Sequence, residues 1–361
     1  MQQYRNDYSE GAAPQILDAL VRTNAEQTPG YGTDAHCARA TELILDEVGL
    51  SDAAVRFVPG GTAANIIAVA ALTDEFEGPI CAADAHPMNH EVGAIQATGR
   101  RLIPTDDALG VMTPDGAERA WLACTATGTH NTRPAMVYIS DTTELGHVWT
   151  AAEFDALCDW ADERGLAVYV DGARMASAVA AAGTARDIRH IARRATAFTL
   201  GGTKNGMLFG EALVVRTGTD RGARAADRLP YLIKRTGALT AKGRLMGVMF
   251  EAAFDPANAD DAGTALYWLL AAHANRCAGA IARNLTELGW DPVLETAGNQ
   301  QFFWVAPALA RELNERFGCE PMDMPDPTGQ GRTVVRFVTS WATDPALIEC
   351  ELVPACRGLT A

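Results

Sequence analysis

Short apolar runs alternate with alanine-rich helical stretches through residues 1–245, and this alternation constrains the fold more than any other feature. Because the runs are almost continuously apolar, we expect a sheet that is covered on both faces. The order strand, helix, strand indicates a mostly parallel sheet and an α/β fold. The predicted strands span 78–83, 100–105, 135–143, 166–174, 195–202 and 211–217, and the predicted helices 14–27, 61–74, 90–99 and 150–165.

The helix expected at 150–165 carries clear boundary signals. Thr150 stands at the N-cap, Glu153 follows at capping-box spacing, and Gly165 is suited to the C-terminal end. Polar residues also stand at or just after the ends of predicted strands. Ligands bind outside the carboxyl ends of strands in open parallel sheets, so these residues are candidates for a site: His86, Glu144, Asp171 and Lys204.

The pattern changes after residue 245. A long helical stretch over 263–289 is followed by apolar runs at 300–306 and 333–341. We therefore predict a large domain over 1–245, which includes an N-terminal arm of residues 1–30. A smaller C-terminal α+β domain is predicted over 246–361.

Composition narrows the class of protein. A formal net charge of -15 without basic clusters disfavours binding to nucleic acid, since nothing neutralises the phosphates. The eight cysteines are scattered and form no C-x-x-C pair, which is typical of a reducing compartment. The polar N-terminus is no signal peptide, and no apolar run approaches the roughly 18 residues of a membrane span. We expect a cytoplasmic protein.

Lys204 lies in the glycine-rich stretch "LGGTKNG" between two apolar runs. It is either a surface charge or a nucleophile that a carbonyl carbon can approach closely. Asp171 ends an apolar strand in "VYVDGAR", where a half-buried carboxylate needs a partner. That partner is either Arg174 or the protonated ring nitrogen of a pyridine cofactor. A lysine and an acid on two such turns form the layout that pyridoxal phosphate chemistry requires.

Gly60, Gly61 and Thr62 stand directly before the predicted helix at 61–74. A glycine turn that opens a helix offers free amide groups and the positive end of the helix dipole to a phosphate. The stretch is neither a P-loop nor a G-x-G-x-x-G fingerprint.

His86, His90 and Glu91 have a spacing that resembles a metal site, but Pro87 separates the histidines and no third ligand stands out. We therefore expect no metal. His86 is either a structural histidine or an imidazole stacked on a cofactor ring, with Glu91 orienting its surroundings.

Two further residues have open alternatives. His130 precedes the strand at 135–143 and is either a surface histidine or part of the site. Arg336 lies inside an apolar strand, where a guanidinium needs a carboxylate. Either a structural ion pair or a clamp on a substrate carboxylate would satisfy it.

These motifs together resemble the low-specificity, or phenylserine-type, L-threonine aldolases, within the β-eliminating lyase superfamily. The similarity runs nearly end to end, over "NDYSEGAAP", "YGTDAHCARA", "GGTAAN", "AHPMNHEVGA", "TTELGHVWT", "VDGAR", "GGTKNG" and "RFVTSW". It implies a pyridoxal-phosphate-dependent subunit of the aspartate aminotransferase fold type I. It also implies active sites shared within a homodimer or homotetramer.

By matching position, the resemblance implies that Lys204 forms the Schiff base, Asp171 pairs with the pyridinium nitrogen and His86 stacks on the ring. Arg174 would lie near the cofactor and the substrate. The resemblance further implies cofactor contacts from Gly60, Gly61, Thr62 and Thr203, and a substrate site drawn from Asn6, Tyr31, Glu91, Arg174, His130 and Arg336.

Asn6 departs from the family pattern, which has serine there, so substrate choice is open. Tyr31 and the segment that holds Lys234, Lys242 and Arg244 match regions that the neighbouring subunit supplies in this family.

The activity implied is cleavage of an L-β-hydroxy-α-amino acid of the threonine, allo-threonine or phenylserine type to glycine and an aldehyde. His86 or His130 would take the hydroxyl proton. Alternatives are a β-eliminating lyase, an aldolase for another hydroxyamino acid, or a non-catalytic protein that keeps the fold.

Overall fold

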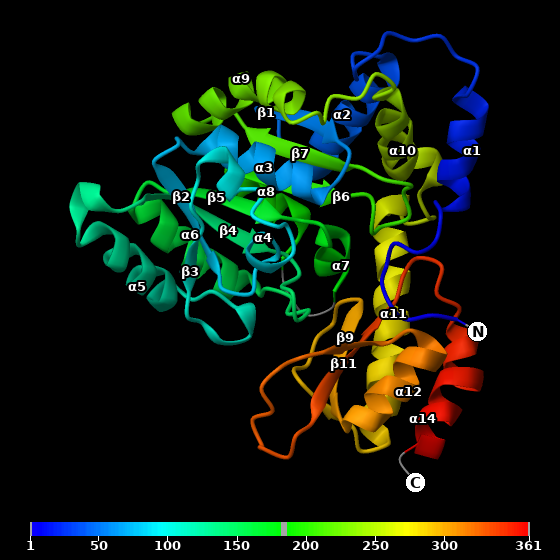
Figure 1. The fold of residues 1–361 in the computed structure, drawn as a ribbon. Helices are drawn as coiled ribbons and strands as arrows, with labels where there is room; N and C mark the ends of the chain where they lie inside the picture. Colours follow the sequence, from blue (N-terminus) through cyan, green and yellow to red (C-terminus); the bar gives the residue numbers. More distant parts are fainter. Residues whose placement is uncertain (1, 182–185, 360–361) are drawn as a thin grey trace.

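The computed structural model describes residues 2–181 and 186–359, and its larger sheet has seven strands in the order β1-β7-β6-β5-β4-β2-β3 (Figure 1). The pairs β2–β3, β2–β4, β4–β5 and β5–β6 are parallel, whereas β7 runs antiparallel to both of its neighbours. The predicted mostly parallel sheet is thus confirmed. The strands are β1 (Ala53–Val58), β2 (Glu77–Ala82), β3 (Ile103–Thr105), β4 (Arg133–Ser140), β5 (Ala167–Asp171), β6 (Ala197–Gly201) and β7 (Glu211–Arg216).

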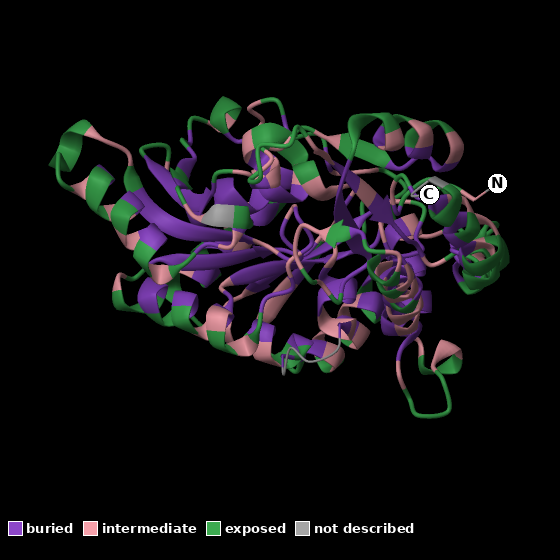
Figure 2. Ribbon diagram, turned by 90° about the horizontal axis from the view of Figure 1, so that it is seen from below, coloured by how far each residue is buried: buried purple, intermediate pink, exposed green. Residues whose placement is uncertain are grey.

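Helices cover both faces of this sheet because consecutive strand residues are apolar. In β4, for example, Met136 and Tyr138 pack toward α3 and α9, whereas Val137 and Ile139 belong to the core on the opposite face. Figure 2 shows the buried strands between helices whose outer faces are exposed. The helices are α1 (Pro14–Thr23), α2 (Ala35–Val48), α3 (Gly61–Leu72), α4 (His86–Asn89), α5 (Pro114–Thr125), α6 (Ala151–Glu163), α7 (Met175–Ala180), α8 (Ile188–Arg194), α9 (Asp220–Arg235) and α10 (Arg244–Phe254).

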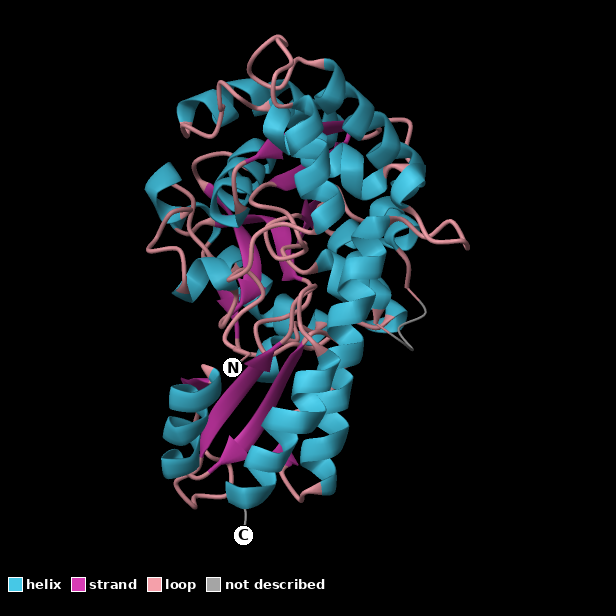
Figure 3. Ribbon diagram, turned by 90° about the vertical axis from the view of Figure 1, so that its right-hand side faces the viewer, coloured by secondary structure: helices cyan, strands magenta, loops and turns pink. Residues whose placement is uncertain are grey.

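A second, antiparallel sheet with the order β10-β11-β9-β8 lies at the C-terminal end (Figure 3). The helix α11 runs alongside it and continues toward α7 and α10 of the larger body (Figure 1). Among the described residues no helix has both the length and the apolar character needed to cross a bilayer. The elements are α11 (Leu266–Glu287), β8 (Asp291–Pro292), β9 (Gln300–Val305), α12 (Pro307–Phe317), β10 (Glu320–Met322), β11 (Thr333–Val338), α13 (Pro345–Leu347), the π-helix Ile348–Leu352 and α14 (Val353–Leu359).

The N-terminal arm connects the two bodies. Tyr4 is buried in the core of the small sheet, and its backbone bonds to Phe317 and Val338 at 2.8 and 2.9 Å. Farther along the arm, α1 packs against α10, which in turn packs against α2. The N-terminal arm therefore packs first against the C-terminal body and then against the larger body. Asp7 lies between the two.

The predicted caps of α6 are observed, but one predicted helix is wrong. Thr150 and Glu153 form the capping box, and Gly165, just beyond the helix, has a φ of 64°. Over 90–99 the chain instead forms turns and a short 3-10 helix, Gln96–Thr98. Val92 and Gly93 have positive φ angles of 52° and 72°, and two such residues interrupt a right-handed helix.

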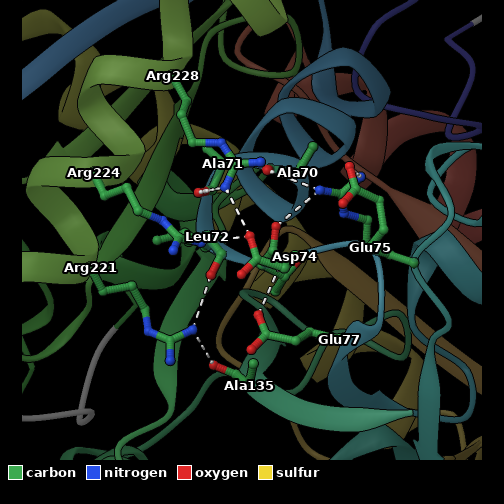
Figure 4. A network of polar contacts seen from close by, with 12 residues as sticks. Ala70, Ala71, Leu72, Asp74, Glu75, Glu77, Ala135, Arg221, Arg224 and Arg228 are labelled. Carbon is green, nitrogen blue, oxygen red and sulfur yellow. Dashed lines mark hydrogen bonds and ion pairs between the residues drawn. The ribbon is translucent and has the colours of Figure 1, made fainter.

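Arginine side chains close the C-terminal end of α3, whose last carbonyl groups lack partners within the helix. Figure 4 shows Arg221 and Arg228 of α9 beside this helix end, together with Arg224. Asp74, just after α3, also pairs with Arg224 at 2.7 Å and with Arg228 at 3.5 Å. The carbonyl contacts are Arg100 to Ala70 and Thr73, Arg228 to Ala71, and Arg221 to Leu72 and Ala135. These contacts fix α3 between α9 and the sheet.

Replacing Arg221 by Met should lower the free energy of unfolding by about 1–3 kcal/mol, because two partly buried carbonyl groups lose their donor. The matched control is Arg224→Met on the same helix face. That arginine is 54% exposed and forms an ion pair, so its loss should cost less than about 1 kcal/mol. Urea unfolding measures both values, and equal losses would contradict the role given to the carbonyl contacts.

Candidate active site

A pocket of about 210 Å³ opens where the carboxyl ends of β4 and β5 meet the N-terminus of α3 and the turn after β6. This is the edge of the sheet at which the sequence predicted a site. It brings together residues that lie far apart in the chain: Gly60, Gly61, Thr62, Asn65, His86, Ser140, Asp141, Glu144, Asp171, Arg174, Thr203, Lys204 and Glu211.

The glycines around Lys204 allow its turn to lie against the turn that follows Asp171. A Cβ atom on Gly201 would stand 2.4 Å from the carbonyl oxygen of Ala173, and one on Gly202 would stand 2.7 Å from that of Gly210. Since real Cβ atoms do not approach this closely, only glycine permits the contact. The lysine and the acid are thereby brought into one pocket.

Asp171 is buried at the end of β5 and is held by neutral donors. It accepts hydrogen bonds from the Asn65 amide at 2.9 Å, from the Ala173 backbone amide at 3.1 Å and from the Tyr138 hydroxyl. Burial, together with the charge of Asp171, holds the pKa of Tyr138 well above its usual value, so this phenol remains a donor. These contacts leave the carboxylate charge available to a cationic ligand group.

Arg174 pairs with Asp7 and not with Asp171, so the simpler alternative for Asp171 is wrong. Its Nε and Nη2 atoms lie 2.7 and 3.1 Å from the two carboxylate oxygens of Asp7, which also accepts from Asn299 at 2.9 Å. Burial would raise the pKa of Asp7, but the charges of Arg174 and Lys204 and these hydrogen bonds hold it below its usual value.

The pKa of Lys204 is lowered by burial and, next, by the charge of Arg174, although Asp7, Glu144 and Asp171 oppose the shift. A lowered pKa increases the neutral fraction of the amine, which is the form that attacks a carbonyl carbon. The environment therefore favours the nucleophile over the surface charge.

His86 forms one wall of the pocket, with Glu91 behind it. The Nδ1 atom of His86 lies 2.8 Å from Glu91, which also accepts from Asn65 at 2.7 Å. The Glu91 side chain is fully buried behind His86 and does not line the pocket, so in this structure it orients His86. The hydrogen bond to Glu91 raises the pKa of His86; burial opposes this, and the charges of Glu144 and Asp171 add to it.

The N-terminus of α3 forms the other end of the pocket. Gly60 is the N-cap and offers no side chain to the first-turn amides. A Cβ atom on Gly60 or Gly61 would meet nothing within 4 Å, so open space lies in front of this helix end. Thr203 also lines the pocket, but its hydroxyl is already bonded, donating to Glu211 and accepting from the Gly210 amide, both at 3.0 Å.

His130 does not line this pocket within its own subunit, so its predicted place in the site stays a prediction. It is exposed in the 3-10 helix Gly128–His130, just before the amino end of β4. The pocket lies at the other end of this strand, at Ser140. Eight strand residues span about 26 Å, so the imidazole is at the opposite edge of the sheet.

Three other predicted substrate residues lie outside the pocket. The Asn6 side chain accepts from the Tyr8 amide at 3.1 Å and from the Ser9 hydroxyl at 2.8 Å, which closes a local turn. Arg336 pairs with Glu320 and donates to the Arg5 carbonyl at 3.4 Å, as in the ion-pair alternative. Both contacts use Nη2 of Arg336, and its Nε atom is buried without a hydrogen-bond partner among the described residues.

Tyr31 lines a different hollow, of about 650 Å³, together with residues of α2, β1 and the segment between α9 and α10. The Lys234 ammonium lies 5.7 Å from the centre of its ring. Any contact of Tyr31 with the Lys204 pocket must come from another subunit, as the resemblance implied.

Several residues that line the pocket or bond to its side chains escaped prediction as site residues. Asn65 lies inside α3 and Tyr138 inside β4, where the pattern indicates only core. Asp7, which pairs with Arg174, adjoins Asn6 and so carried a usable signal. Among the described residues, no group of three or more histidine, cysteine or acidic side chains is placed to hold a metal ion.

A mostly parallel sheet with a lysine, an acid and a glycine-opened helix at its carboxyl edge defines an aminotransferase-like α/β enzyme. Residues 5–306 match the family described as beta-eliminating lyase, and the chain belongs to that family. The low specificity L-threonine aldolase of Pseudomonas aeruginosa is 29% identical over 347 residues, covering 95% of this chain and 94% of that protein.

Solved structures agree with this assignment. A threonine aldolase from Leishmania major superposes with a TM-score of 0.91 at 34% identity, and the match covers all of both chains. Thermus thermophilus aspartate aminotransferase has a TM-score of 0.68 at 15% identity, covering 98% of this chain and 89% of that one. The second likeness concerns the fold alone.

Glu211 supplies a test of the electrostatics of the pocket. Burial raises the pKa of this carboxyl from 4.5 to about 8, although the Thr203 hydroxyl opposes the shift. The unfolded chain therefore releases this proton at a lower pH than the folded one, and the free energy of unfolding falls as pH rises between these values.

The variant Glu211→Gln lacks the titrating carboxyl group and therefore its pH-dependent contribution to the free energy of unfolding. Between pH 5 and pH 8 the wild type should lose more stability than the variant, by up to about 4 kcal/mol. Urea unfolding of both proteins at the two pH values measures the difference. An equal loss in both would mean that residue 211 is ionised in the folded state.

Proposed function

We propose that this protein is a pyridoxal-phosphate-dependent aldolase that cleaves L-β-hydroxy-α-amino acids to glycine and an aldehyde. The observation that carries the proposal is the meeting of Lys204, Asp171 and the open N-terminus of α3 in one pocket. The relatives named low specificity L-threonine aldolase support the substrate class.

The residues present fit pyridoxal phosphate. The first-turn amides of α3 and the Thr62 hydroxyl would hold the phosphate, and Asp171 would hold the ring nitrogen. The His86 ring would lie against the cofactor, and Lys204 would bind its aldehyde. Bound there, pyridoxal phosphate supplies an electron sink for the bonding pair released at the substrate α-carbon.

The pocket residues would then position the substrate. Asp171 contributes a carboxylate, and Lys204 contributes an amine whose lowered pKa increases the neutral fraction that can accept a proton. Asp7 uses two of the three guanidinium nitrogens of Arg174, so Nη1 can meet a substrate carboxylate.

An alternative on the same scaffold is a β-eliminating lyase, which the family description favours. A lyase releases ammonia and a keto acid, whereas an aldolase releases glycine and an aldehyde. We further infer a homodimer or homotetramer that works in the cytoplasm. The position of Tyr31 beside a separate hollow supports shared sites, and the scattered cysteines support a reducing compartment.

The proposed function is tested by the products. The protein loaded with pyridoxal phosphate should convert threonine, allo-threonine or phenylserine to glycine and the matching aldehyde. Mass spectrometry identifies both products. Release of ammonia and a keto acid from these substrates, without glycine, would support the lyase instead.

The proposed bond between Lys204 and the cofactor aldehyde can be tested by chemical trapping. Borohydride reduction of the loaded protein should fix the cofactor on the peptide that holds Lys204, because that lysine lies in the pocket and has a lowered pKa. The chain's other lysines, Lys234 and Lys242, are exposed and serve as internal controls. Lys204→Ala should lose the visible absorption, and a label on another lysine would falsify the assignment.

Kinetic measurements on alanine variants distinguish the contributions of His86 and His130 to the reaction. His130→Ala should leave kcat/KM for threonine within about twofold, because the imidazole lies at the opposite edge of the sheet. His86→Ala should lower it at least about tenfold, since His86 forms a wall of the pocket. A large loss in His130→Ala would indicate that a neighbouring subunit brings His130 into the site.

A further inference from the structure

Glu144 is an acid of the pocket that the roles described so far do not use. The other pocket acids are bonded: Asp171 to Asn65, Glu211 to Thr203, and Asp141 to Arg186 at 2.6 Å. Glu144 is half-buried, and among the described residues it has no hydrogen-bond or ion-pair partner. A carboxylate that is partly desolvated and unpaired is costly unless a ligand provides the donor.

The backbone fixes Glu144 in place. It lies in the turn after β4, where the Gly146 amide donates to the Thr143 carbonyl at 2.9 Å and the Thr143 amide to the His147 carbonyl at 3.0 Å. The next residue, Leu145, is buried against Phe302 of the small sheet. The turn is therefore tied to the sheet on one side and to the C-terminal body on the other.

The charge of Glu144 shifts the pKa values of His86 and Lys204. It raises the pKa of His86, after Glu91, and it opposes the lowering of the Lys204 pKa. Glu91, Glu144 and Asp171 raise the pKa of His86, which increases the fraction of the ring that is protonated and cannot accept a further proton. Within this subunit His130 lies at the opposite edge of the sheet, so Glu144 is the unpaired acceptor that remains in the pocket.

Resting on the proposed function, we propose that Glu144 is the catalytic base that takes the proton from the substrate β-hydroxyl group. As the O–H bond breaks, its electron pair forms the carbonyl bond of the aldehyde, and the Cα–Cβ bond breaks. The electron pair of that bond stays with the α-carbon. A proton then returns to the α-carbon to give glycine, so no oxidant or reductant is needed.

Two reactions of the loaded enzyme separate this role from a structural one. Cleavage of threonine needs a base for the hydroxyl proton, whereas exchange of the α-proton of glycine with deuterated water does not. In Glu144→Gln, kcat/KM for cleavage should fall about 10²- to 10⁴-fold, while glycine exchange stays within about threefold. Cofactor absorbance should be unchanged.

The matched control is Asp84→Asn. Asp84 shares a small neighbouring cavity with Glu144 but does not line the Lys204 pocket. Both of its rates should stay within about threefold of the wild type. Cleavage by Glu144→Gln at the wild-type rate would overturn the proposal, and so would an equal loss of cleavage and exchange.

A second readout needs neither cofactor nor substrate. The His86 ring is faced by Glu91, Asp171, Glu144 and, at 5.4 Å, by the His90 ring. Removing the Glu144 charge should lower the pKa of His86, which an NMR titration of the unloaded protein measures. If the His86 pKa is the same in Glu144→Gln and in the wild type, the Glu144 charge does not act on His86, which contradicts the position given to Glu144 in the pocket.

The result that would contradict the proposed function differs from the result that would contradict only the role of Glu144. If the wild type forms no aldehyde from any hydroxyamino acid, the aldolase proposal and the role of Glu144 are both overturned. If the wild type cleaves threonine and Glu144→Gln cleaves it equally well, only the role of Glu144 is overturned.

Discussion

The amide of Asn65 joins the two acids on which the pocket depends. Its nitrogen donates to Asp171 at 2.9 Å and to Glu91 at 2.7 Å, and its oxygen accepts from the Tyr169 hydroxyl at 2.9 Å. One buried side chain on α3 thereby fixes Asp171, which would pair with the cofactor ring nitrogen, and Glu91, which orients His86. Without it, two carboxylates would lie buried near each other without a common donor, which disfavours their charged forms.

The sequence predicted those parts of the site whose signal is local. Asp171, Lys204 and the Gly60–Gly61 turn stand where a strand ends or a helix begins, and such ends gather at one edge of a parallel sheet. Asn65 and Tyr138 lie inside elements whose pattern indicates core, so only the assembled fold shows that they bond to Asp171. His130 precedes its strand, and within its own subunit it therefore lies at the edge of the sheet opposite the pocket.

The same distinction between local sequence signals and long-range contacts applies to the prediction of the fold. Long apolar strands and the capping box of α6 were predictable because each depends on residues close in sequence. The helix expected over 90–99 is interrupted by the positive φ angles of Val92 and Gly93, and the side-chain pattern does not show the φ angle of a valine. Likewise, the pairing of Arg336 with Glu320 joins two strands and could only be left as an alternative.

The pocket keeps its acids in different states by giving each a different neighbour. Asp7 meets Arg174 and has a lowered pKa, whereas burial raises the pKa of Glu211 to about 8 against the opposing effects of the Thr203 hydroxyl and the Lys204 charge. Their environments, more than their chemical type, set these states, which is how one site can supply both a fixed charge and a proton. Glu144 differs from both because it has no hydrogen-bond or ion-pair partner in the described part of the chain, so a substrate hydroxyl can donate to it.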